Sequence, residues 1–384
     1  MTEAFRLRHC YFWIYALVGV LGPFFGPYLH SLGLSGIEVG VLAAITPVAM
    51  AVVPPLWGAA ADRLGETTTL LRVVLFGATL ALVPFPFASQ FAPLAAILAL
   101  FALFRAGTGP LLDSITFTLI ERDGGEFGRT RVWGSVGFLA SSTVVAVLAD
   151  AVSDVVIAVA LVTSQGLAAL SSLAVPRAPR PQSVNLWADL RTLMSGWPFR
   201  LFLVATFFEN LAASAPLVFY PLHLREAGAS NVYIAAFWAT GVLAEVALFQ
   251  FAPALLARVR PGSLYLAAFV AVALRYGLLL VVTDPIAIVG IQVLHALSFG
   301  AFYYASVTWL AQTVPVRLRA TGQAVFAAVG FGIAGGTSSL LGGWLFDHGH
   351  IEAVLIASVA AGVVGLVCAL PTAARMNHDA KGAA

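Results

Sequence analysis

The sequence predicts an all-α membrane protein with twelve transmembrane helices in two pseudo-symmetric six-helix bundles. Of its residues, 60% are hydrophobic and only 10% are charged, whereas a soluble domain carries about 25% charged residues. The apolar residues also fall into runs long enough to cross a bilayer, and short patterns recur half a chain length apart. A net charge of +2 is too small to indicate nucleic-acid binding.

Twelve stretches reach the length of about 20 mainly apolar residues that a membrane span needs. We expect spans at residues 11–30, 37–60, 68–88, 93–118, 131–149, 154–175, 199–222, 231–257, 263–282, 286–309, 320–343 and 351–371. The longest connection lies between the sixth and seventh spans, and its Trp187–Met194 part fits a short amphipathic helix on the membrane surface. The predicted parts are an N-terminal bundle at 1–175, a cytoplasmic linker at 176–197, a C-terminal bundle at 198–372 and a cytoplasmic tail at 373–384.

Basic residues predict the orientation of the spans. The first apolar run follows Arg6 and Arg8, lacks a small-residue cleavage site and continues to Tyr28, so we expect a retained span and not a signal peptide. If the N-terminus is inside, the outer loops contain Arg225, the spans contain Arg105 and Arg275, and every other lysine or arginine lies on the inner side. The positive-inside rule therefore predicts two cytoplasmic termini. We expect the membrane to be a prokaryotic cytoplasmic (inner) membrane.

Short repeats indicate that the two halves arose from one six-span unit. The Leu-His and Gly-x-Ser pairs within residues 29–35 recur within residues 222–230. The Val-Gly-Phe triplet at 136–138 recurs at 329–331, at nearly the same offset. Parallel repeats of this kind place a substrate site near the membrane midplane, where the halves meet.

The fourth span contains Arg105 in the middle of an apolar run. A charge at this depth costs at least about 2.5–3.5 kcal/mol, so it needs a partner, a water-filled cavity or a function. Two interpretations remain open: an ion pair that ties helices together, or an anchor whose planar fork binds a substrate carboxylate. Asp113 lies about 80° around the helix and about 12 Å along it, so we expect it to pack or cap and not to pair with Arg105.

The second half carries several titratable residues inside spans. Glu209 and Glu245 lie in the seventh and eighth spans, and a buried isolated carboxylate favours its protonated form, as proton coupling requires. Alternatively, either residue forms a structural salt bridge, for which Arg275 is a candidate partner. His295 in the tenth span titrates near neutral pH, and Gln292 lies one turn earlier on the same side.

The loop after the second span carries a recognisable pattern of glycines and charges. Gly58, Asp62, Arg63 and Gly65 have the spacing G-x-x-x-D-R-x-G. This pattern resembles the loop signature of the major facilitator superfamily. The chain departs from it at residues 66–68, where Glu-Thr-Thr replaces the usual basic residues, so the charge pairs that gate the loop are expected to differ.

Three further stretches indicate a branch of that superfamily. Residues 131–138 (RVWGSVGF), 292–300 (QVLHALSFG) and 319–323 (RATGQ) resemble the phenylpropionate-permease-like branch, near the lactose and nucleoside proton symporters. The resemblance implies a central cavity lined by the first, fourth, seventh and tenth spans. We therefore expect substrate contacts at Arg105, Tyr28, Asn210, Phe299 and Tyr303. We expect proton coupling at Glu209, His295 and Glu245, and gating or structural roles at Asp62, Arg63, Asp113, Arg131, Arg275 and Gln292.

These residues predict a secondary transporter, most simply a proton symporter of a small organic solute, with an aromatic or other carboxylate favoured. The alternatives are a proton-coupled exporter of drugs or metabolites, a sugar or nucleoside symporter of the same fold, and a membrane enzyme or receptor, which no catalytic constellation supports. Cys10 and Cys368 fit no metal spacing and no phosphate-binding loop is present, so we expect neither metal nor cofactor. The expected partners are the substrate, protons and the lipid bilayer, without nucleic acid, and the protein is expected to act as a monomer.

Overall fold

A computed structural model describes residues 3–64, 66–124, 126–178, 186–256 and 259–382. Side chains are described within these ranges except at residues 61–64, 123, 186–188, 252–256, 316 and 379–382. The side chains of Asp62 and Arg63, which carry the predicted loop signature, lie outside the described residues, as does that of Trp187. The described backbone is almost entirely helical and contains no β-strand.

The chain forms two compact units. The first comprises Met1–Ser183 with Tyr220–Ala235, and the second comprises Val184–Phe219 with Ala236–Ala384. The first unit therefore includes the end of one helix and the start of the next from the second half of the sequence. The boundaries of the predicted linker and tail remain predictions.

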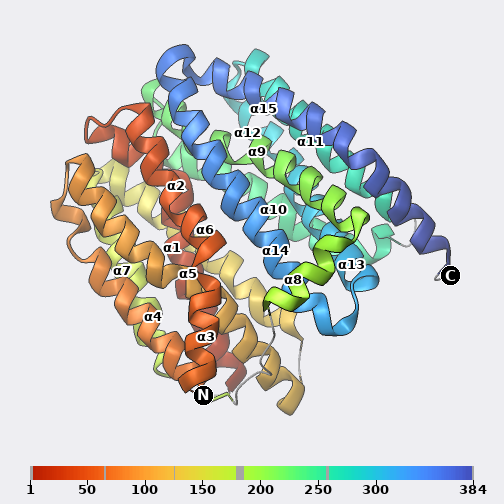
Figure 1. Cartoon of the computed structure of the whole chain (residues 1–384). Coiled ribbons are helices and arrows are strands. Elements are labelled where there is room, and N and C mark those ends of the chain that lie inside the picture. Colours follow the sequence, from red (N-terminus) through yellow and green to blue (C-terminus); the bar gives the residue numbers. More distant parts are fainter. Residues whose placement is uncertain (1–2, 65, 125, 179–185, 257–258, 383–384) are drawn as a thin grey trace. The chain divides into compact units, whose positions relative to one another are not determined.

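The helices of the first unit are coloured red to yellow-green in Figure 1. They are α1 (Glu3–Ser31), α2 (Gly36–Val52), α3 (Pro54–Leu64), α4 (Thr67–Leu82), the short η1 (Phe85–Phe87), α5 (Phe91–Asp123), α6 (Phe127–Ala151) and α7 (Val155–Ser172). A capping box starts α2, because Ser35 accepts a hydrogen bond from the Glu38 backbone while the Glu38 side chain accepts one from Ser35.

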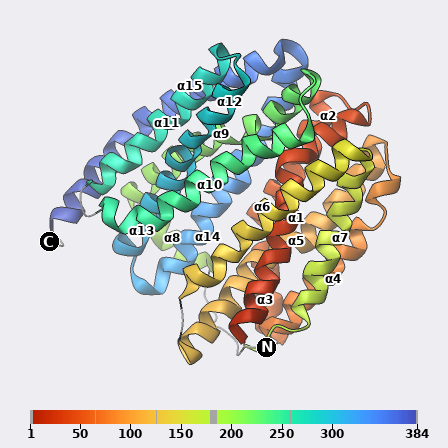
Figure 2. The same cartoon turned by 180° about the vertical axis from the view of Figure 1, so that it is seen from behind.

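The helices of the second unit are coloured green to blue, and Figure 2 shows them from behind. They are α8 (Leu186–Ser195), α9 (Trp197–Glu226), α10 (Asn231–Leu256), α11 (Pro261–Val281), α12 (Pro285–Ile291), η2 (Gln292–Leu294), η3 (Ala296–Ala301), α13 (Phe302–Thr313), η4 (Val316–Leu318), α14 (Arg319–Ala327), η5 (Ala328–Ala334) and α15 (Gly335–Gly382). Helix α8 covers the segment that the sequence marks as amphipathic.

The described helices confirm the predicted fold class. Ten of them are long and apolar enough to cross a membrane, or eleven if the bent pair α2 and α3 is one span. The last of these contains α14, η5 and α15, and α15 joins two helices across a kink at Gly349 and His350. Counting that kink as a boundary gives the twelve spans that hydropathy predicts. The second predicted span, 37–60, is broken into α2 and α3 by a bend of 46°, where Pro54 and Pro55 remove backbone donors.

Glycines allow α1 and α6 to pack closely in the first unit. A Cβ at Gly137 would collide with the carbonyl oxygen of Phe12, so only glycine fits this helix crossing. Nearby, the Ser141 hydroxyl donates a hydrogen bond to the Ala16 carbonyl at 2.7 Å. The apolar core beside this crossing includes Tyr11 and Leu71, which are at most 1% exposed.

The second unit repeats this arrangement at the matching positions of its sequence. A Cβ at Gly330 would lie 2.9 Å from the Asn210 side chain on α9. Eight residues after Gly330, one turn further along than Ser141 is from Gly137, the Ser338 hydroxyl donates to the Leu211 carbonyl at 2.8 Å. The echoed Val-Gly-Phe triplets thus mark equivalent helix contacts, which supports descent of the two halves from one six-span unit.

Two segments of the second unit have π-helical hydrogen bonding: η3, which follows His295, and η5. Single π turns within α-helices are rare and concentrate at functional sites. Helix α12, which leads to η3, begins with Asp284 as its cap and Pro285 at its first position. Gln292 and His295 follow α12 three residues apart, and both contact Arg275.

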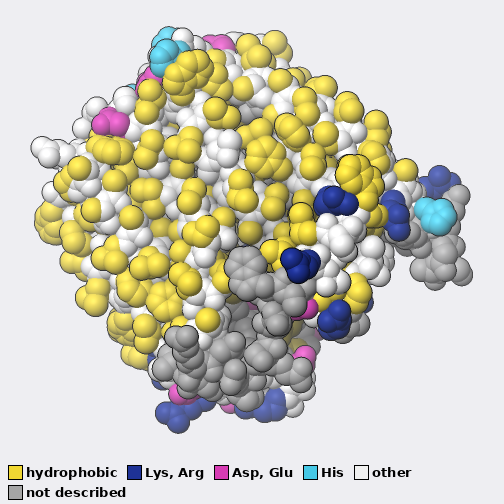
Figure 3. Space-filling model, viewed as in Figure 1, with side chains coloured by type: hydrophobic (Ala, Val, Ile, Leu, Met, Phe, Trp, Pro, Cys, Tyr) yellow, Lys and Arg dark blue, Asp and Glu magenta, His cyan; other side chains and the backbone are white. Residues whose placement is uncertain are grey.

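Large apolar side chains cover the outward surfaces of both units. Phe87, Leu80, Val281 and Ile286 are between 73% and 87% exposed, and Figure 3 shows hydrophobic side chains across most of the face it presents. A soluble monomer rarely exposes so continuous an apolar surface. With the spanning helices, this surface identifies an integral membrane protein.

Candidate functional site

Arg105 lies in the middle of α5 and is half-buried. The described residues give it neither a hydrogen bond nor an ion pair, although Tyr15 lies close enough for electrostatic interaction. The backbone next to it is held by Trp57, whose indole donates to the Leu103 carbonyl at 2.7 Å and packs against Gly107. A guanidinium that no described residue pairs with is available to bind an anion.

Asp113 has a different environment on the same helix. The Tyr11 hydroxyl donates to its carboxylate at 2.6 Å, and Arg131 lies close enough to interact with its charge. The guanidinium of Arg131 in turn stacks 3.7 Å above the ring of Tyr15. As the sequence predicts, Asp113 does not pair with Arg105; it belongs to a cluster that joins α1, α5 and α6.

A buried network surrounds Arg275 in the second unit. The Arg275 side chain is 3% exposed and donates to the Gln292 side-chain oxygen at 3.1 Å through Nε, and again through Nη2. Its Nη1 lies 3.1 Å from Nδ1 of His295 and 3.5 Å from the Tyr276 hydroxyl. That hydroxyl donates to the Ala213 carbonyl at 3.0 Å, so the network joins α9, α11 and the residues around η2.

Glu245 completes the network on α10. One of its carboxylate oxygens lies 3.6 Å from Nε2 of His295, and the two side chains are only 20% and 13% exposed. Gly241, one turn earlier, leaves room for the His295 side chain, whose Cβ and Cδ2 lie 3.2 and 3.3 Å from where a Cβ on Gly241 would be. The other face of His295 stacks on Phe299, with ring centroids 5.3 Å apart and planes 2° from parallel. His295 therefore connects an arginine to a carboxylate, an arrangement that can pass a proton.

Glu209 lies beside this network but is not bonded into it. It is 2% exposed, and its Oε2 has no hydrogen-bond partner among the described residues. Arg275 is near enough to interact with its charge, yet the two form no ion pair in the described part of the chain. The next residue, Asn210, donates to the Thr206 carbonyl at 3.0 Å.

The remaining predicted substrate contacts differ in exposure. Tyr28 is 4% exposed and its ring lies 5.8 Å from that of Phe85, so within the first unit it fills the core. Tyr303 is 38% exposed, and Phe299 stacks on it at 6.0 Å. The rings of Phe299 and Tyr303 form a row with the ring of His295 along η3 and α13. Their contact with substrate remains a prediction.

A polar cluster in the first unit escaped the sequence-based assignment. Asp150 accepts hydrogen bonds from both the backbone and the side chain of Asn231, each at 2.8 Å, and so caps α10. Arg225 donates to Asp154 at 3.2 Å. The sequence shows Asp150 and Asp154 at the ends of two spans and Arg225 in another outer loop. Hydropathy does not reveal that these loops meet.

Sequence comparison identifies the family. Residues 4–356 match the MFS_1 like family. The maltose permease of Geobacillus stearothermophilus is 29% identical over 370 residues, covering 95% of this chain and 93% of the relative. A probable 3-phenylpropionic acid transporter of Escherichia coli (strain K12) is 25% identical over 352 residues, covering 88% of this chain and 90% of the relative.

The fold is that of known transporters. The crystal structure of the nucleoside transporter NupG matches with a TM-score of 0.84 at 17% identity, covering 97% of this chain and 99% of that chain. The resemblance predicted from the loop signature and the motifs of the fifth, tenth and eleventh spans is thereby confirmed. The chain belongs to the MFS_1 like family and is an integral membrane transporter of the major facilitator fold.

Proposed function

We propose that this transporter is a proton-coupled symporter of a small organic carboxylate, working by alternating access. The observation that carries the proposal is the half-buried Arg105, which has no hydrogen bond or ion pair among the described residues. A guanidinium binds a carboxylate through two parallel hydrogen bonds. Such a substrate would supply the negative charge that the described residues do not place next to Arg105.

The second unit supplies groups able to carry the coupling proton. Glu209 can take up a proton at Oε2 without breaking a described hydrogen bond. The His295–Glu245 pair is the alternative, since a proton shared between these groups changes the charge that Arg275 faces. We assign the coupling proton to Glu209 and a relay role to His295 and Glu245.

The membrane context follows from the distribution of basic residues. We propose that the protein resides in a prokaryotic cytoplasmic membrane with both termini inside, because that orientation places nearly all arginines on the inner side. It would act as a monomer, since parallel repeats within one chain suffice for alternating access.

The test is uptake into proteoliposomes under an imposed pH gradient. With an acid exterior, a labelled aromatic carboxylate such as phenylpropionate should accumulate inside, and Arg105→Gln should abolish accumulation. Arg129→Gln is the matched control, because Arg129 is 75% exposed and pairs with Glu126 on the surface of the same unit. Carboxylate uptake that survives Arg105→Gln would refute the anchor, and expulsion driven by the same gradient would indicate an exporter.

A sugar is the second candidate substrate, because the chain is 29% identical to a maltose permease in an alignment that covers 95% of this chain. An arginine can also donate hydrogen bonds to sugar hydroxyls. Labelled maltose and labelled phenylpropionate should therefore be compared as substrates under the same pH gradient. Accumulation of maltose alone would select the sugar.

A further inference from the structure

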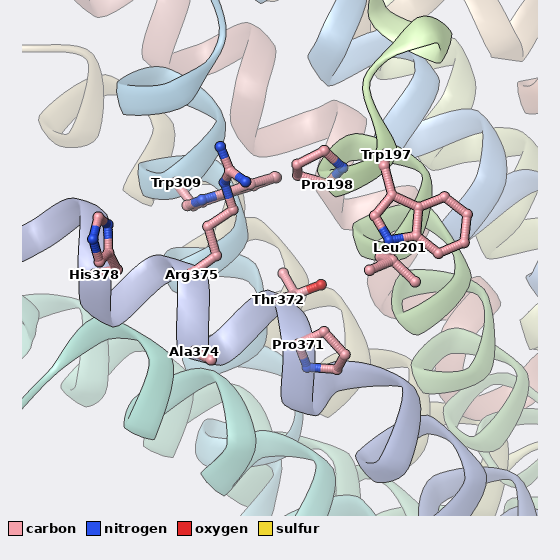
Figure 4. Close-up of a pocket in the computed structure, with 9 residues that line it drawn as sticks. All are labelled: Trp197, Pro198, Leu201, Trp309, Pro371, Thr372, Ala374, Arg375 and His378. Atoms are coloured by element: carbon pink, nitrogen blue, oxygen red, sulfur yellow. The ribbon is translucent and has the colours of Figure 1, made fainter.

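A groove of about 510 Å³ lies at one end of the second unit. It is bounded by the first two turns of α9, by α13 and by the last turns of α15, as Figure 4 shows. None of the residues proposed to bind substrate or proton lines it. Its walls combine apolar rings with a few polar groups, which is the usual make-up of a site for a small molecule.

Two buried donors in this groove have no hydrogen-bond partner in the described part of the chain. Trp309 and Thr372 are each 3% exposed, and both line the groove. The indole nitrogen of Trp309 and the hydroxyl of Thr372 find no hydrogen-bond partner among the described residues. An unpaired buried donor costs about 1–3 kcal/mol, so two of them in one groove indicate that a ligand with acceptor oxygens completes the site.

The charge of the groove selects an anion. Arg375 and His378 lie one and almost two turns beyond Thr372 on α15, and both line the groove. Phosphate and carboxylate oxygens accept hydrogen bonds from such groups, and an arginine adds charge-assisted bonds to them. The described lining contains no aspartate or glutamate that would repel an anion.

The apolar part of the groove selects a lipid. Trp197 is 62% exposed, and tryptophans of this kind sit at the level of lipid headgroups. Val367, one turn before Pro371 on the same face of α15, is 61% exposed. The groove therefore continues into a surface suited to acyl chains, which a soluble anion would not use.

We infer that this groove binds the headgroup of an anionic phospholipid, with its phosphate on Trp309, Thr372 and Arg375 and its acyl chains along Trp197 and the adjoining surface of α15. The positive-inside orientation would assign this lipid to the inner leaflet. Bound there, the lipid would hold α9, α13 and α15 together.

The experiment measures lipid binding to the purified full-length protein in micelles by native mass spectrometry and by the melting temperature. Phosphatidylglycerol should stay bound and raise the melting temperature, whereas phosphatidylcholine and inorganic phosphate should not. Arg375→Gln should weaken phosphatidylglycerol binding by about tenfold or more. Thr372→Val, which keeps the side-chain shape, and Trp309→Phe, which keeps an aromatic ring of smaller size, each remove one donor and should weaken it severalfold.

Arg317→Gln is the matched control. Arg317 belongs to the same unit, is 72% exposed and pairs with Asp189 at 3.8 Å, so its loss removes the same charge without touching the groove. If Arg317→Gln weakens binding as much as Arg375→Gln, the attraction is a general charge effect and the site is refuted. If inorganic phosphate raises the melting temperature as much as phosphatidylglycerol does, the ligand is not a lipid. If the Thr372→Val and Arg375→Gln variants bind phosphatidylglycerol normally, the groove is not its binding site.

Discussion

Each unit carries an arginine inside a span, and the two arginines have opposite surroundings. Arg275 is 3% exposed and bonds to Gln292, His295 and Tyr276. Arg105 is half-buried and has no hydrogen bond or ion pair among the described residues. Because the cost of an intramembrane charge applies to both, the partnered arginine is explained by the protein's own structure. Arg105 has no such explanation among the described residues, which is the basis of the proposed anion site.

The carboxylates show the reverse pattern. Asp113 in the first unit accepts a hydrogen bond from Tyr11, whereas Oε2 of Glu209 in the second has no described partner. Arg105 and Glu209 are thus intramembrane charges of opposite sign for which the described residues offer no ion pair or hydrogen bond at the named atoms. The proposed function assigns an anion to the first and a proton to the second.

The largest expected loss of stability follows removal of the satisfied arginine. Arg275→Met leaves Gln292 and His295 without their donor, and should lower the free energy of unfolding by about 3–5 kcal/mol. Thermal unfolding in detergent measures this, with Arg129→Gln expected to stay within about 1 kcal/mol of the native protein. An unchanged melting temperature in the Arg275→Met variant would show that the Arg275 network does not stabilise the second unit.

Removing the unsatisfied arginine should have a large effect on binding alone. Arg105→Gln should cost about 2–5 kcal/mol of carboxylate affinity, as for one partner of a buried charge pair. The melting temperature should hold or rise, because no described bond is lost. Arg105→Lys keeps the charge but loses the planar fork, so an intermediate affinity is expected. A fall in stability comparable to that of Arg275→Met would show that Arg105 is structural.

A moderate effect is expected at the satisfied carboxylate. Tyr11→Phe removes the donor to Asp113 and should destabilise the protein by about 1.5–3 kcal/mol, the range for hydrogen bonds to charged groups. Unfolding in detergent reports the loss, and substrate affinity should be unchanged. Altered affinity with unchanged stability would place Asp113 in the transport pathway instead.

The smallest change in stability is expected at the unsatisfied carboxylate. Glu209→Gln keeps the shape and loses no described bond at Oε2, so stability should stay within about 1 kcal/mol of the native protein. Proton-driven accumulation should disappear while substrate exchange across proteoliposomes continues. If Glu209→Gln still accumulates substrate and Glu245→Gln does not, the coupling proton belongs to the His295–Glu245 pair.

Much of the fold was predictable from the sequence. A run of some 20 apolar residues has few alternatives to a spanning helix, and the repeated Val-Gly-Phe triplets mark equivalent contacts at Gly137 and Gly330. The bend between α2 and α3 was not predicted, although Pro54 and Pro55 lie at its hinge. Prolines inside a span allow a kink but do not determine its angle, which depends on the neighbouring helices.

The candidate residues were predictable as anomalies, but their partners were not. Arg105, Glu209 and Arg275 stand out because a charge in an apolar run has few explanations. That Arg275 bonds to Gln292 and His295, and not to a glutamate, depends on which helix faces meet. Asp150 and Asn231 meet for the same reason, and no local pattern in the chain indicates their contact.

The π-helical segments η3 and η5 affect how this chain should be aligned with others. A π turn holds one residue more than the α turn it replaces, so a relative with an unbroken α-helix here would be one residue shorter. An alignment that forbids a gap within a span would shift every later position of that span by one residue. His295 precedes η3 and Tyr303 follows it, so comparing both with their counterparts in such a relative requires a one-residue gap at Ala296–Ala301.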